Sequence, residues 1–135
     1  MFDLDALNTA IVAKVTATSA LDSIDGKTAY GFIAAGTSRP KCRFSVVTDA
    51  LKGSYDGSVL STINIQFSVF ADSIDVATDL QKALCNAFHR TQLTLTSGKN
   101  VGSQVREGWR LLVEGEKPEA VIYHAIVVIE FTVLS

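Results

Sequence analysis

The sequence is short of charged residues. Only 19% of its 135 residues are charged, against roughly a quarter in an average globular domain. Apolar residues make up 47%, so a core can form while the surface has little charge to keep copies of the chain apart. The net charge of −2 also disfavours a general nucleic-acid binder, because such proteins are usually basic. This composition predicts that a partner covers part of the surface.

Cysteine is scarce as well. Cys42 and Cys85 are the only two, and neither belongs to a CxxC or Cys-His signature. One disulfide is possible, but a chain this rich in apolar residues does not need a covalent staple. The sequence favours two free thiols, as expected in a reducing cytoplasm.

Long hydrophobic runs and export signals are missing. No window reaches the roughly 18 consecutive apolar residues of a membrane span. The start, Met1-Phe2-Asp3, is acidic where a secretory signal would be basic. We therefore expect no membrane partner and a protein made and kept in a cytoplasm.

Recognisable catalytic motifs are also missing. The chain has no G-x-S-x-G elbow, phosphate loop or dinucleotide fingerprint. His89 and His124 have no second ligand type two, three or four residues further on, as a metal site would need. The favoured interpretation is a surface histidine and a packed strand histidine, with a subunit contact as the alternative for His124. We expect no enzyme activity, metal or cofactor.

The periodic segments define the predicted elements. Apolar residues at helical spacing predict helices over 3–21 and 73–91. A strict alternation of apolar and polar residues predicts a strand over 58–71. Shorter strands are expected over 29–34, 43–48, 93–95 and 109–114, with a polar connection over 49–57 and a loose loop before Trp109.

The last strand, predicted over 120–134, differs from the others because both of its faces are apolar. It is either a central strand buried under two layers or a strand whose second face is covered by a neighbouring subunit. The second alternative makes four residues a candidate subunit interface: Ile122, His124, Ile126 and Val128.

The predicted order is α-β-β-β-α-β-β-β, with turns too short for parallel crossovers. We therefore expect one domain over residues 1–135, of the α+β class, with a mostly antiparallel β-sheet and two α-helices packed on one face.

Basic residues are concentrated in two predicted loop regions. Arg39, Lys41 and Arg43 lie in and after the first, and Lys99 and Arg106 lie in the second. They are either ordinary solvated loops or surfaces that converge on the lumen of a ring or on an acidic partner.

This arrangement resembles the tail terminator, or tail-completion, proteins of long-tailed bacteriophages and their prophages. The resemblance rests on the N-terminal helix, the Arg39-Pro40 loop with the short strand to Val47, the long strand 58–71 followed directly by an acidic-start helix, and the closing strand 123–133. It implies an α+β subunit of a hexameric ring at the head-proximal end of the tail tube. Such a ring stops tube polymerisation and provides the head-joining surface.

The resemblance also implies partners and a location. The partners are further copies of the chain, the major tail tube protein, a head-completion or connector protein, and DNA that passes through the lumen without sequence-specific binding. The location is the virion tail, assembled in the cytoplasm of a bacterial host. The alternatives are a head–tail connector, a minor tail protein or a small ligand-binding domain.

Overall fold

A computed structural model describes residues 4–34, 36–53, 59–96, 98–114 and 121–134, and the side chains of these except 48–53, 59–61 and 133–134. The helices are α1 (Leu4–Ala17), the 3-10 helix η1 (Ser19–Ile24) and α2 (Ile74–Phe88). The strands are β1 (Thr28–Tyr30), β2 (Lys41–Gly53), β3 (Val59–Ala71), β4 (Thr91–Thr94), β5 (Asn100–Glu114) and β6 (Ile122–Leu134).

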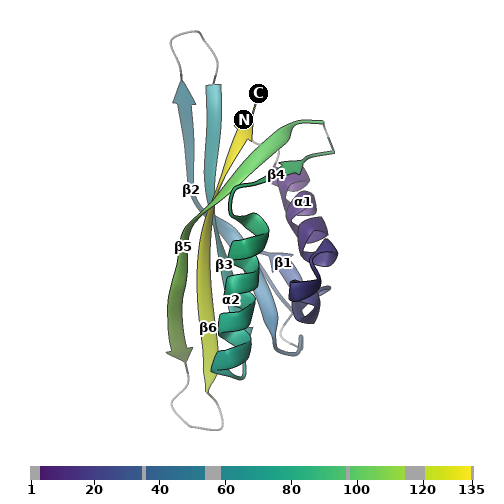
Figure 1. The fold of residues 1–135 in the computed structure, drawn as a ribbon, viewed down its shortest axis with the longest axis vertical. Helices are drawn as coiled ribbons and strands as arrows, with labels where there is room; N and C mark the ends of the chain where they lie inside the picture. The colour runs from purple at the N-terminus through teal and green to yellow at the C-terminus, as the bar shows by residue number, and fades with distance from the viewer. Residues whose placement is uncertain (1–3, 35, 54–58, 97, 115–120, 135) are drawn as a thin grey trace.

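The described strands form one six-stranded sheet in the order β1-β2-β3-β6-β5-β4. Every neighbouring pair is antiparallel except β1 with β2. Both α-helices lie on the same side of the sheet (Figure 1). The predicted α+β class, mostly antiparallel sheet and one-sided helices are confirmed.

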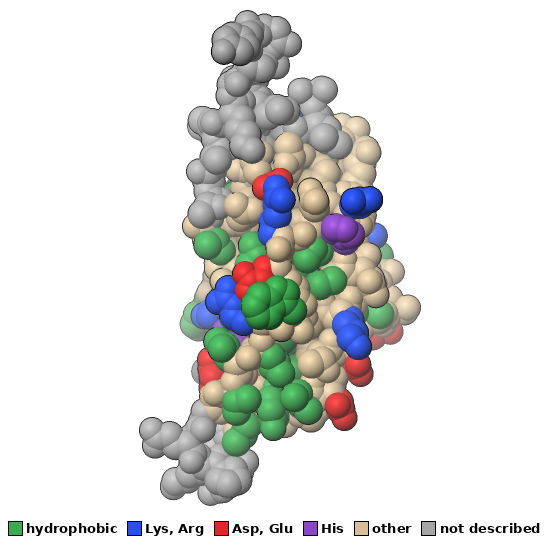
Figure 2. Space-filling view, turned by 60° about the vertical axis from the view of Figure 1, so that its left-hand side comes forward, with side chains coloured by type: hydrophobic (Ala, Val, Ile, Leu, Met, Phe, Trp, Pro, Cys, Tyr) green, Lys and Arg blue, Asp and Glu red, His purple; other side chains and the backbone are tan. Residues whose placement is uncertain are grey.

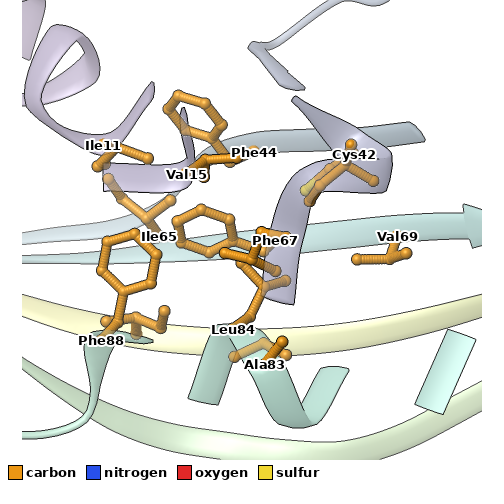
Figure 3. Close-up of a cluster of buried hydrophobic side chains, with 14 of the residues drawn as sticks. Ile11, Val15, Cys42, Phe44, Ile65, Phe67, Val69, Ala83, Leu84 and Phe88 are labelled. Atoms are coloured by element: carbon orange, nitrogen blue, oxygen red, sulfur yellow. The ribbon is translucent and has the colours of Figure 1, made fainter. Parts of the chain in front are cut away.

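The core lies between the helices and one face of the sheet (Figure 3). Phe67 of β3 is at its centre, with ring centroids 5.3 Å from Phe44 of β2 and 5.5 Å from Phe88 of α2. α1 contributes Leu7, Ile11 and Val15, the apolar stripe that its sequence predicts. The odd-numbered residues of β3 and β6 supply most of the sheet side of the core.

The first helix ends earlier than predicted, at Ala17 rather than near residue 21. The hydroxyl of Thr18 donates to the carbonyl of Lys14 at 2.6 Å, and the Thr18 N–H bonds to Val15 instead. Threonine competes in this way for backbone partners at helix ends. The chain then continues as η1, which places Leu21 and Ile24 in the core.

Two strands are longer than predicted. β2 continues to Gly53, so the first part of the expected polar connection 49–57 is strand, while 54–57 lie outside the described residues. β5 begins at Asn100 rather than at Trp109. In both cases a long neighbour, β3 or β6, supplies backbone partners that outweigh weak local strand propensity. β1, by contrast, has only three residues, Thr28–Tyr30, and overlaps the predicted 29–34 strand at two of them.

β5 carries two bulges where it pairs with β6, one between Val105 and Glu107 and one between Glu107 and Arg110. α2 contacts the second bulge. The Gln81 side-chain amide donates to the carbonyls of Arg110 at 2.8 Å and of Ile126 at 3.1 Å. These bonds satisfy two carbonyls beside the bulge, where the regular hydrogen bonding between β5 and β6 is disrupted.

Gly108 lets the bulge approach α2 closely. A Cβ added at Gly108 would collide with the sulfur of Cys85 and lie 3.3 Å from a methyl of Val105. We expect Gly108→Ala to lower the free energy of unfolding by about 1–2 kcal/mol, the usual cost of overpacking. Denaturant unfolding should show that most of this cost disappears in a Cys85→Ala background. An equal cost in both backgrounds would contradict the contact.

Candidate interaction surfaces

One face of the sheet is covered by no helix of the described part of the chain (Figure 1). The even-numbered residues of β6 point to this face, because the odd-numbered ones are in the core on the other side. Ile122 and Val128 are partly exposed there. This uncovered face is the surface on which the sequence placed a subunit contact.

Two of the four predicted interface residues are buried within the subunit. Ile126 is 3% exposed and His124 is 8% exposed. In the sheet register, Ile126 lies between Ser68 of β3 and Arg110 of β5. The expectation that Ile126 and His124 present a surface is therefore corrected. Ile122 and Val128 remain predicted contact residues.

His124 is packed into the sheet. Its ring stacks on Phe70 with centroids 4.5 Å apart, and its Nδ1 lies 3.1 Å from a carboxylate oxygen of Glu114. The other nitrogen, Nε2, is buried and has no hydrogen-bond partner among the residues that the structure describes. The interpretation of His124 as a packed strand histidine is confirmed.

Three of the predicted basic residues converge. Arg39, Lys41 and Arg43 line one hollow of about 290 Å³, together with Phe32, Ile33, Phe70, Glu114 and Ile122. Arg39 pairs with Asp72 at 2.5 Å, and the Arg43 guanidinium lies 5.8 Å from the centre of the Phe70 ring. The lining combines three cations with apolar side chains and one carboxylate, and its excess of positive charge suits an acidic or amphipathic partner.

Lys99 and Arg106 do not join that hollow. Lys99 precedes Asn100, which pairs with Leu134 of β6. Lys41 pairs with Phe70 of β3, which in turn pairs with His124 of β6. These two positions on β6, Leu134 and His124, are ten residues apart, or roughly 33 Å at ~3.3 Å per residue. Lys41 and Arg106 also lie on strands rather than in loops, which corrects the sequence interpretation, whereas Arg43 lies on a strand as predicted.

The charges around Arg106 are balanced. Its guanidinium bonds both carboxylate oxygens of Glu130 at 2.8 to 3.1 Å, and Arg110 bonds Glu107 at 2.6 and 3.0 Å. The hydrogen bond from Arg110 lowers the pKa of Glu107. Both pairs border a hollow of about 430 Å³ that also includes Val47 and Val128. This part of the uncovered face is polar without being basic.

An apolar patch near the end of β5 was not predicted. Val113 is 62% exposed and Leu112 is 42% exposed, and Ile74 and Val76 are exposed at the start of α2. Figure 2 shows hydrophobic side chains gathered below the centre, over the lower part of β5 and the start of α2. Trp109, in the bulge, is 79% exposed. The sequence predicts a loop before Trp109 because of the glycines at 102 and 108, and so it does not predict this patch. A glycine inside a strand pattern can instead indicate a bulge, as it does here.

No group of three or more metal-binding side chains comes together among the described residues. Within the same part of the chain, no helix is long and apolar enough to cross a membrane.

The two cysteines are free thiols, as predicted. Burial raises the pKa of Cys42 to about 12, and partial burial raises that of Cys85. Because the thiolate is the nucleophile, we expect iodoacetamide to leave Cys42 unmodified in the folded protein and to modify Cys85 slowly. Peptide mass spectrometry should show both modified after unfolding. Equal labelling of the two cysteines in the folded state would contradict this prediction.

Comparison with protein-family models and with curated proteins found no match. Among solved structures, the chain is similar to a component of the virion of a native gene transfer agent particle. The two share 18% sequence identity and a TM-score of 0.68, over 96% of this chain and 96% of that one. A second solved structure, which carries no functional description, aligns at 13% identity and a TM-score of 0.59, over 98% of this chain and 93% of the other. At these identities the likeness establishes that the chain shares the fold of these proteins.

Proposed function

We propose that this chain is a structural protein of a phage or prophage virion, a tail terminator that caps the tail tube at its head-proximal end. One observation carries the proposal: the fold matches a chain of a gene transfer agent virion over 96% of both chains. As a single domain, the protein ends tube polymerisation and provides the head-joining surface, without catalysis. Its partners are the major tail tube protein, a head-completion protein and five further copies in a hexameric ring.

The uncovered sheet face supports an assembling role. A sheet face that no helix covers needs another layer when it carries apolar side chains. Ile122 and Val128 are partly exposed on this face and belong to the subunit contact in the proposal. The low fraction of charged residues points the same way, because it leaves little repulsion between copies.

The hollow lined by Arg39, Lys41 and Arg43 supports a second contact in the same assembly. In the proposed ring it faces either the lumen, where DNA passes without sequence-specific contacts, or an acidic surface of the head-joining partner. The balanced ion pairs of Arg106 and Arg110 make the rest of the uncovered face a weaker candidate for contact with DNA.

Deleting the gene from its phage or prophage tests the proposal. We expect headless tails of uncontrolled length beside tail-free heads, assembled in the host cytoplasm. Wild-type protein should restore particles. The Val128→Lys variant should not restore particles, because a charge would be buried in the subunit contact. Val12→Lys is the matched control, since Val12 is exposed on α1 away from this face.

The lengths of the tails separate the alternatives. Overlong tails support a terminator. Tails of normal length that fail to join heads would contradict termination and favour a head–tail connector. Normal joined particles would contradict a role in tail completion altogether.

A further inference from the structure

Part of β5 is an open sheet edge. β4 pairs only with the first residues of β5, Asn100 to Ser103, so residues 104–114 have no strand on that side among the residues that the structure describes. Proteins usually protect such an edge with bulges, prolines or charges, because unpaired backbone groups attract another strand. The bulges of β5 protect residues 105–109. The segment 110–114 has neither a bulge nor a proline and stays in regular register with β6.

This segment is complementary to itself. It reads Arg110-Leu111-Leu112-Val113-Glu114. Within one chain Arg110 bonds Glu107, and Glu114 contacts His124. When two copies pair antiparallel about Leu112, each Arg110 also lies opposite the other copy's Glu114, and each Leu111 lies opposite a Val113. Directly opposed residues of an antiparallel pair interact, and opposite charges or apolar pairs are favourable there.

The side chains of the segment divide suitably between the two faces. Arg110, Leu112 and Glu114 are in register with Ile126, His124 and Ile122, so they point to the uncovered face. Leu111 and Val113 point to the helix side, and Ile74 and Val76 are exposed at the start of α2, which covers that side. Pairing would place ion pairs around an apolar centre on one face and cover apolar side chains on the other.

We propose that two copies of this chain associate through the open edge of β5, with residues 110–114 of each copy forming an antiparallel, two-fold symmetric strand pair. Such a contact joins the two sheets into one. It is isologous and therefore differs from the head-to-tail contact that closes a ring. It goes beyond the proposed function and can hold or fail independently of it.

Charge reversal tests the pairing. Arg110→Glu places two glutamates opposite each other at both ends of the pair, and Glu114→Arg does the same with arginines. Each single variant should dimerise roughly tenfold more weakly than wild type in sedimentation equilibrium, because two favourable pairs become repulsive. An equimolar mixture of the two variants should recover dimers, since every opposed pair is then of opposite charge. Thermal unfolding of each variant checks that it is folded.

A symmetric cross-link tests the register. Leu112 faces its own copy across the two-fold axis, so Leu112→Cys should form a disulfide-linked dimer under mild oxidation. Wild type controls for the native thiols, and Val12→Cys controls for an exposed cysteine elsewhere; neither should cross-link comparably.

The proposal is overturned if wild type sediments as a monomer at high concentration. It is also overturned if the mixture of charge variants stays monomeric while wild type dimerises, or if Leu112→Cys cross-links no faster than Val12→Cys. A dimer through β5 in a protein that caps no tail would leave this contact standing and the tail function refuted.

Discussion

Replacing Phe67 with alanine is expected to lower the free energy of unfolding by about 3–5 kcal/mol, as is usual for a fully buried phenylalanine. Phe67 is completely buried, and its ring contacts aromatic rings from both β2 and α2. The substitution leaves a cavity where the sheet meets its helix, and the surrounding side chains can fill it only in part. Denaturant unfolding monitored by circular dichroism measures the effect.

Phe70 provides the matched control for this substitution. It lies on the same strand but on the uncovered face, where it is partly exposed and stacks on His124. Phe70→Ala should therefore cost clearly less than Phe67→Ala. If the two variants lost equal stability, the core would not be on the helix side of the sheet.

Replacing Gln81 with leucine is expected to cost about 1–3 kcal/mol, although the volume is nearly unchanged. The Gln81 amide donates to the carbonyls of Arg110 and Ile126, and leucine leaves both without this donor. A buried polar group that loses its partner costs its full desolvation energy. Hydrogen exchange should show the additional loss of protection in β5 and β6 around the bulge.

Gln92→Leu is the control for the change in side-chain chemistry. Gln92 is exposed on β4, so the same substitution there should change stability by less than about 0.5 kcal/mol. A tolerated Gln81→Leu would mean that the bulge is held by β6 alone.

The sequence pattern predicts the elements that depend on local periodicity. The alternation in β3 and most of the stripe of α2 translate into burial, because side-chain spacing fixes which residues share a face, although Val76 of that stripe is exposed. Most of β5 could not be predicted. Its bulges exist because β6 supplies a long partner and because Gln81 and Cys85 of α2 contact the bulge.

The surfaces could be predicted only in part. The clustering of Arg39, Lys41 and Arg43 follows from their nearness in sequence. Lys99 and Arg106 lie apart from these three residues because of the spatial order of the strands in the sheet. That order does not follow from the positions of the strands in the sequence. Ile126 is a candidate interface residue in the sequence because β6 is apolar on both faces, yet it is buried between two neighbouring strands.

The role proposed for this chain is to cap a tail tube. Cryo-electron microscopy of purified tail tubes incubated with the protein tests it most directly. The account predicts a hexameric ring of density at one end of each tube, into which six copies of this fold can be placed, and no further tube growth from that end when tube protein is added. Bare tube ends that keep growing in the presence of saturating protein would contradict the account.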